Sequence, residues 1–263
     1  MIENNTIGKG WIAALPMYDW PEIRAETDAQ WARLRDRLRA SGVAAPQALT
    51  RENTAGGELD LAALWRAPAL LLAQTCWGPM ELGLAEHVEV VGQPDYSDCE
   101  GGEGEFYSSA VVMRGTGDGV KAPANGHEAL PLDVLRGKRL AFNSVDSMSG
   151  VLALGRDLVA LGESFSLFCG QTETGGHRAS LAAVADGKAD VAAVDCRSWS
   201  LFRRFEPDVS SRLEVVGWTA RRRGLPFITA KETPPAVVAV LKKALASLPR
   251  DEFGPAPWLP AHS

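Results

Sequence analysis

The sequence has no long apolar run. No stretch of its 263 residues approaches the roughly 18 consecutive apolar residues of a membrane-spanning helix. The first residues, Met1 to Asn5, do not join a basic segment to an apolar one, so no secretory signal peptide is predicted. With this start as the true one, we expect a cytoplasmic protein without a membrane anchor.

The sequence also has few clusters of basic residues and no cysteine pairs with the spacing of metal ligands. The net charge is −6 and the densest basic cluster is the three-residue run 221–223, which argues against a nucleic-acid partner. The four cysteines, at positions 76, 99, 169 and 196, form no Cys-x-x-Cys pair, so we expect free thiols and no zinc site. No phosphate-binding loop of the GxxxxGK[ST] type occurs. The sequence therefore predicts no metal and no cofactor.

The sequence does contain a regular alternation of short apolar runs and amphipathic stretches. The run 69–75 is apolar without alternation, which is typical of a strand covered on both faces. We expect strands at 11–15, 69–75, 88–91, 106–113, 139–143, 165–169, 190–195 and 213–218. Helices are expected between them, among others at 149–162, 178–186, 197–206 and 234–248. A segment rich in Gly, Pro, Asn and Asp near 114–130 divides this pattern into two α/β units.

The segment 140–150 is the most informative part of the chain. An apolar strand leads into a turn of small hydroxyl residues, and an amphipathic helix follows it. The first amides of a helix lack internal partners, so together with Ser147 and Ser149 they could hold an oxyanion. The alternative is that Asp146 or Ser147 only caps the helix.

Other polar residues are expected at the same kind of position. In folds of this class ligands bind outside the carboxyl ends of the strands. Tyr18, Gln74 with Thr75, and Asp195 each follow or end a predicted strand. The two glycines before His177 allow close backbone approach, and His177 begins a helix, where it could donate a hydrogen bond to an anion or be a surface residue.

Three ordered segments, 143–150, 174–177 and 186–195, resemble the phosphate-, phosphite- and phosphonate-binding proteins of ABC importers. This resemblance implies an α/β fold of the type II periplasmic-binding class, with two lobes that are each a mainly parallel sheet flanked by helices. It implies a first lobe of residues 1–112 and 221–263, a second lobe of residues 113–220, and a ligand cleft between them. It also implies a periplasmic, non-enzymatic component of an ABC importer, in contrast to the cytoplasmic location expected from the start of the chain.

The resemblance also assigns roles to residues. It implies that Ser147, the Met148 amide, Ser149 and His177 grip the oxyanion, that Tyr18 closes over the ligand, and that Gln74 and Thr75 line the opposite wall. Family members that bind aminoalkyl phosphonates pair the ligand amine with acidic residues. Asp195 is the candidate here, although the nearby Arg197 would favour a more anionic ligand.

Two other functions remain open. A cytoplasmic enzyme could use Cys76 or Cys196 as a nucleophile beside His177. A ligand-sensing protein could use the same fold and report to a partner protein, because no DNA-binding helix pair is evident in the sequence.

Overall fold

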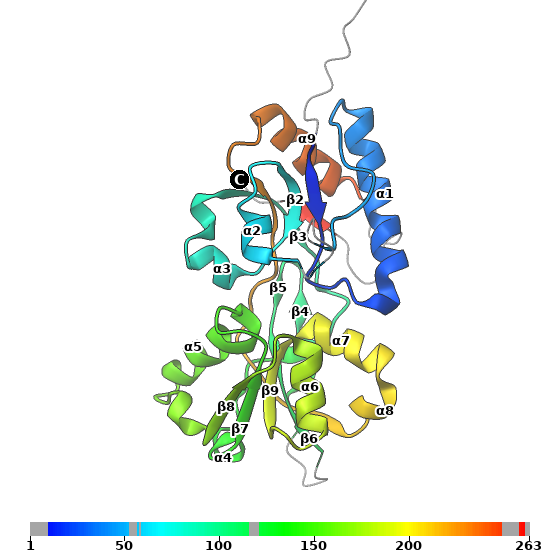
Figure 1. Ribbon diagram of the computed structural model, residues 1–263. Helices are drawn as coiled ribbons and strands as arrows, with labels where there is room; N and C mark the ends of the chain where they lie inside the picture. The colour runs from blue at the N-terminus through cyan, green and yellow to red at the C-terminus, as the bar shows by residue number, and fades with distance from the viewer. Residues whose placement is uncertain (1–9, 53–56, 58, 116–120, 249–257, 261–263) are drawn as a thin grey trace, which may run out of the picture. The chain divides into compact units, whose positions relative to one another are not determined.

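The computed structural model describes residues 10–52, 57, 59–115, 121–248 and 258–260, and it divides into two compact units. The first unit runs to Asp95 and resumes at Leu225, and the second runs from Tyr96 to Gly224 (Figure 1). The first boundary therefore falls earlier than the expected 112/113, and the second falls at 224/225 instead of 220/221. Strand β6 (Ser109–Arg114) pairs with two strands of the second unit, so a cut at 112 would divide it, and residues within 102–107 form a small sheet with residues 222–223 in the same unit.

The first unit is built on a five-stranded sheet. Its order is β1 (Ile12–Ala14), β2 (Leu70–Gln74), β12 (Phe227–Ala230), β3 (Val88–Pro94) and β13 (Trp258–Pro260). Strand β2 is buried along its whole length, as its unbroken apolar run predicts. Helices α1 (Arg24–Ala40) and α9 (Pro235–Ala246) share one hydrophobic core with the sheet, while α2 (Leu61–Trp65) and α3 (Trp77–Glu81) share another.

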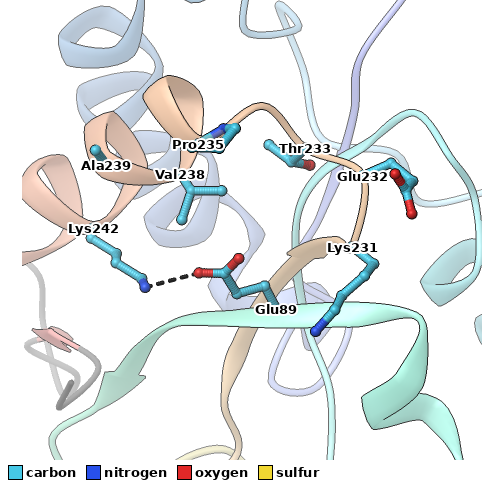
Figure 2. A pocket seen from close by; sticks show the side chains of 8 residues that line it. All are labelled: Glu89, Lys231, Glu232, Thr233, Pro235, Val238, Ala239 and Lys242. Carbon is cyan, nitrogen blue, oxygen red and sulfur yellow. Dashed lines mark hydrogen bonds and ion pairs between the residues drawn. The ribbon is translucent and has the colours of Figure 1, made fainter.

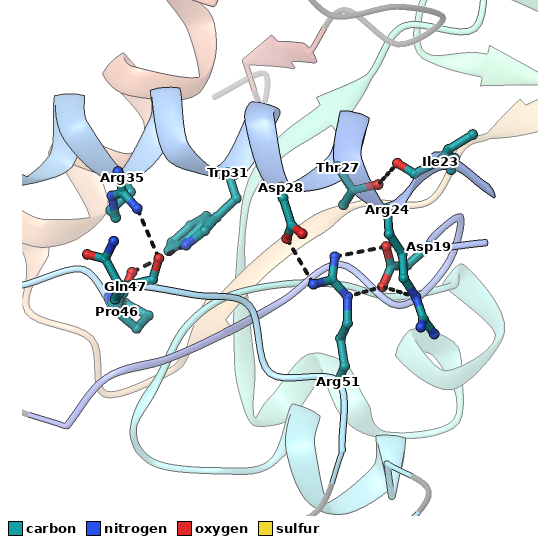
Figure 3. A network of polar contacts seen from close by, with 10 residues as sticks. All are labelled: Asp19, Ile23, Arg24, Thr27, Asp28, Trp31, Arg35, Pro46, Gln47 and Arg51. Atoms are coloured by element: carbon teal, nitrogen blue, oxygen red, sulfur yellow. Dashed lines mark hydrogen bonds and ion pairs between the residues drawn. The ribbon is translucent and has the colours of Figure 1, made fainter. Parts of the chain in front are cut away.

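A polar network fastens the loop after α1 to that helix (Figure 3). Arg51 binds Asp19 at 2.5 Å and Asp28 at 2.8 Å, and the hydrogen bond to Asp19 raises the pKa of the Arg51 guanidinium. The indole of Trp31 donates to the Pro46 carbonyl at 3.2 Å. Because Asp19 directly follows Tyr18, the network holds the loop on which Tyr18 lies.

The second unit also has a five-stranded sheet. Its order is β10 (Leu213–Trp218), β6, β9 (Val191–Asp195), β7 (Arg139–Phe142) and β8 (Gly170–Glu173). Strands β9, β7 and β8 are parallel neighbours, and the helices α5 (Ala153–Ala160), α6 (His177–Ala185) and α7 (Cys196–Phe205) connect or follow them (Figure 1). A small sheet of β11 (Arg222–Arg223), β5 (Phe106–Tyr107) and β4 (Gly102–Glu103) belongs to the same unit.

The expected fold class is confirmed, with a refinement of the sheets. Strand β12 in the first unit and strand β6 in the second run antiparallel to both of their neighbours, so each sheet is mixed. Neither strand is reached through a βαβ crossover helix, which is the connection that makes neighbouring strands parallel. The expected strand at 106–113 is divided into β5 and β6.

One expected strand was wrong. Residues 165–169 do not form a strand, because Phe165–Leu167 makes a 3₁₀ turn (η5) and β8 begins at Gly170. Leu167 and Phe168 are buried in the core of the second unit, which explains the apolar signal. Strand β8 lies at the edge of the sheet and is largely exposed, so its sequence, Gly-Gln-Thr-Glu, carries no apolar pattern.

Helix α5 is fastened to the end of the second unit by a buried ion pair. The Asp157 carboxylate, 4% exposed, binds Arg222 at 2.5 Å and accepts a hydrogen bond from the Ala220 amide at 2.8 Å.

In the described part of the chain, no helix is both long and apolar enough to cross a membrane.

Candidate functional site

The carboxyl ends of three parallel strands bring four of the predicted residues together in the second unit. The turn that holds Ser147 and Ser149 follows β7, His177 follows β8, and Asp195 ends β9. Backbone hydrogen bonds from Thr174 to the Phe142 carbonyl (2.8 Å) and from Gly175 to the Asn143 carbonyl (2.9 Å) join the first two turns. The predicted convergence at one sheet edge therefore holds for this unit.

Ser147 is the residue that caps the helix, and Asp146 is not. Its hydroxyl oxygen accepts a hydrogen bond from the Gly150 amide at 3.0 Å. The helix begins with a π turn (η4, Met148–Leu152), because both the Val151 and the Leu152 amides donate to the Ser147 carbonyl. Such widened turns occur frequently at functional sites. Capping uses the Ser147 oxygen as an acceptor, so its own O–H hydrogen remains able to donate.

Met148 begins this widened turn. Its side chain is buried, and its sulfur lies 3.8 Å from an Arg156 nitrogen. The Met148 side chain is therefore enclosed by the second unit.

The ring of His177 lies between a hydroxyl and a carboxylate. Its Nε2 atom is 2.8 Å from the Ser149 hydroxyl and 3.4 Å from an Asp195 carboxylate oxygen. The Ser147 hydroxyl lies 3.4 Å from that of Ser149. A carboxylate can only accept, so Asp195 favours the tautomer with hydrogen on Nε2. The Ser149 oxygen then accepts from the ring, and its O–H hydrogen can donate elsewhere.

The cluster uses neutral donors at neutral pH. Burial lowers the pKa of His177 below its ordinary value of 6.5, and the nearby Asp195 charge opposes this shift only in part. The neighbouring cation, Arg197, is itself buried, binds Asp98 at 3.0 Å and lies over the Tyr96 ring at 5.0 Å. Its charge is thus compensated by Asp98.

Asp195 has a structural role that was not predicted from the sequence. One of its carboxylate oxygens accepts from the Ser198 amide at 2.9 Å and caps α7, while the other lies near His177. The side chain is only 2% exposed. Both oxygens therefore have partners within the protein.

Asn143 also borders this cluster, and it was not among the residues predicted from the sequence. Its buried side-chain oxygen has no hydrogen-bond partner, and a Cβ atom added to Gly150 would lie 2.0 Å from it. This close approach explains why glycine occupies position 150, although glycine is unfavourable inside a helix. The position of Asn143 directly after β7 was the one available signal.

The remaining predicted residues lie in the first unit. Gln74 ends β2, and its side chain donates to the Leu225 carbonyl at 3.3 Å. The Thr75 hydroxyl is fully buried and has no hydrogen-bond partner. Tyr18 is half-buried in the loop after β1, the parallel neighbour of β2.

The Cys196 thiol is poorly suited to act as a nucleophile. Cys196 is buried, and this burial together with Cys99 raises the pKa of its thiol well above the ordinary range. A cysteine nucleophile needs the opposite shift. Cys76 belongs to the first unit and is half-buried at the start of α3.

A separate cavity of about 430 Å³ lies in the first unit (Figure 2). The ion pair between Glu89 and Lys242, at 2.9 Å, borders it, and none of the predicted site residues lines it. Among the described residues, no group of three or more His, Cys, Asp and Glu side chains could hold a metal ion.

A family comparison identifies the class of protein. The profile described as "ABC transporter, phosphonate, periplasmic substrate-binding protein" matches residues 43–256. The chain therefore belongs to this family, whose members are substrate-binding proteins and not enzymes. The family resemblance noted in the sequence is confirmed. No curated protein matches the chain.

Solved structures share the fold. PhnD1 from Prochlorococcus marinus, in complex with methylphosphonate, has a TM-score of 0.70 at 18% identity, covering 96% of this chain and 93% of that one. The binding-protein component PA3383 of an ABC phosphonate transporter from Pseudomonas aeruginosa has a TM-score of 0.65 at 14% identity, with coverages of 95% and 81%. XAC2383 from Xanthomonas citri, bound to chloride, reaches 0.66 at 16% identity, with coverages of 96% and 91%.

Proposed function

We propose that this chain binds a small tetrahedral oxyanion, namely a phosphonate, phosphite or phosphate, and delivers it to the membrane subunits of an ABC importer. The observation that carries the proposal is the cluster of Ser147, Ser149 and His177 at the starts of two helices of the second unit. Membership of the phosphonate-binding family and the methylphosphonate complex of the similar PhnD1 fold support the ligand class.

The proposed binding uses hydrogen bonds and no protein cation. The hydroxyls of Ser147 and Ser149 can both donate, since the Ser147 oxygen accepts from the Gly150 amide and, in the Nε2–H tautomer of His177, the Ser149 oxygen accepts from the ring. Hydrogen bonds to an ionised acceptor are about twice as strong as those between neutral groups. Of the first amides of this helix, that of Gly150 already donates to Ser147, and that of Ser149 adds a donor of the same kind.

We assign Asp195 an orienting role in this proposal. Its carboxylate is nearly fully buried and is occupied by Ser198 and His177, so it is suited to fix the ring of His177. For the first unit we propose Thr75 and Tyr18 as ligand contacts. Of the two residues that end or follow β2, Thr75 is the better candidate, because Gln74 donates to Leu225.

The first test is a thermal-shift panel with methylphosphonate, aminoethylphosphonate, phosphite, phosphate and, as a control, sulfate. A ligand at 100 times its dissociation constant adds about 2.7 kcal/mol to the free energy of unfolding. For a chain of this length we expect Tm to rise by roughly 5–10 °C. If none of the phosphorus oxyanions changes Tm at millimolar concentration, the proposed ligand class is wrong.

The second test locates the site. Ser149→Ala should reduce the Tm shift to near zero, whereas Ser166→Ala should retain it. Ser166 is a matched control because its hydroxyl also lies near that of a serine two positions earlier, Ser164 at 2.8 Å, but in an exposed turn. An unchanged ligand response in Ser149→Ala would refute the assigned anion turn without affecting the family assignment.

A further inference from the structure

Cys99 and Cys196 are buried neighbours in the second unit, with exposures of 5% and 1%. The Cys99 side chain is close enough to that of Cys196 to help raise its pKa, and the Cys99 sulfur also lies 3.7 Å from an Asp98 carboxylate oxygen. Neither is paired in a disulfide in this structure.

The chain neighbours of the two cysteines hold them in this arrangement. Asp98, directly before Cys99, forms an ion pair at 3.0 Å with Arg197, directly after Cys196. The Arg197 guanidinium also lies over the ring of Tyr96, 5.0 Å from its centroid. A backbone hydrogen bond from Cys99 to the Tyr96 carbonyl, at 2.9 Å, fixes the turn on which Cys99 lies.

We propose that Cys99 and Cys196 are the site of a disulfide that forms when the chain folds in the presence of a thiol oxidant. With a small disulfide such as oxidised glutathione, one cysteine thiolate attacks a glutathione sulfur and releases one glutathione thiolate. The second cysteine thiolate then attacks the mixed disulfide and releases the other. Two cysteine thiols are oxidised, the glutathione disulfide is reduced, and both protons end on the released thiols.

Burial determines when this bond can form. An oxidant cannot reach the two thiols in the folded unit, and the raised pKa of Cys196 keeps its reactive thiolate scarce. The disulfide therefore forms during folding and does not act as a switch in the folded protein. It would close a loop from the start of the second unit to α7, containing strands β4 to β9.

The test maps the disulfide after oxidative refolding. The full chain is reduced, unfolded, refolded in a buffer of reduced and oxidised glutathione, alkylated and digested without reduction. We expect a linked peptide pair containing Cys99 and Cys196, with Cys76 and Cys169 alkylated. Four alkylated cysteines in refolded protein, or a link that involves Cys76 or Cys169, would overturn the proposal. Should the chain not refold, the same mapping on protein secreted into a bacterial periplasm decides between these outcomes.

Two further readouts use the folded protein. In the native reduced chain, the exposed Cys169 should be alkylated quickly, while Cys99 and Cys196 should resist until denaturant is added. The linked form should melt roughly 5–15 °C above its reduced form, because the bond closes a long loop. Cys99→Ser should abolish this difference and Cys169→Ser should retain it; the reverse pattern would contradict the assignment.

Discussion

Asp195 makes two structural contacts, one with the Ser198 amide and one with the ring of His177, and two substitutions can test them separately. Asp195→Ala removes the cap of α7, which costs about 1 kcal/mol, and leaves the buried ring of His177 without its carboxylate partner, which costs about 1–3 kcal/mol. Loss of a buried charge offsets part of this cost. We therefore expect a net loss of roughly 2 kcal/mol, which lowers Tm by about 4–8 °C.

Asp195→Asn is the matched variant. Its amide oxygen can still accept from the Ser198 amide, and asparagine is a good helix cap, so we expect a loss of about 1 kcal/mol or less. Because Asp195 raises the pKa of His177, the asparagine variant should also lower that pKa further, which NMR of the ring can measure. Calorimetric Tm values should fall in the order wild type, Asn, Ala. Equal effects of the two substitutions, or changes within about 1 °C, would refute the assigned contacts.

Three further predictions follow from the described contacts. Burial lowers the pKa of His177 below 6.5, so as pH falls the unfolded state binds the proton first, and the free energy of unfolding should decrease below about pH 6.5. In urea denaturation at pH 7 and 5, His177→Gln should reduce this loss of stability. A variant that loses as much stability as the wild type between these pH values would contradict the prediction. Arg222→Met removes the ion-pair partner of the buried Asp157 carboxylate on α5, and it should lower the free energy of unfolding by about 2–4 kcal/mol in urea denaturation. Arg223→Met, at a more exposed position, should lower it by under about 0.5 kcal/mol. Equal losses in the two variants would contradict the assigned buried ion pair. Hydrogen bonds from Arg139 lower the pKa of Asp190 to about 2, so this carboxyl group should titrate near pH 2 in NMR. Arg139→Gln should return the pKa toward 3.8. An ordinary pKa of Asp190 in the wild type would contradict the ion pair with Arg139.

Local patterns were sufficient to predict the α/β class and most elements, while the type II periplasmic-binding fold was implied by the family resemblance. Unbroken apolar runs indicated β2 and β9, and the inward-facing Leu181 and Val184 indicated α6, each of which the structure contains. The edge strand β8 could not be predicted, since its exposed Gly-Gln-Thr-Glu sequence has no apolar signal and the adjacent Leu167 and Phe168 have a strong one. The reversed strands β6 and β12 depend on long-range pairing, which a local pattern does not encode.

The candidate site was predictable in its strand-end positions and not in its contacts. Ser149, His177 and Asp195 were predicted at one edge of the second unit because each follows or ends a predicted strand. In the structure, His177 lies within hydrogen-bonding range of Ser149 and within ion-pair range of Asp195. The pairing of Arg197 with Asp98, nearly one hundred positions away in the chain, had no sequence signal, so the compensation of its charge could not be predicted. The roles of Tyr18, Gln74 and Thr75 toward a ligand remain predictions.

The most direct test of the central claim is a crystal structure of the full chain grown with methylphosphonate. We predict a tetrahedral group whose oxygens lie about 2.5–3.2 Å from the hydroxyls of Ser147 and Ser149, beside the ring of His177. A methylphosphonate bound elsewhere, or a turn without ligand in crystals grown at saturating concentration, would contradict the account.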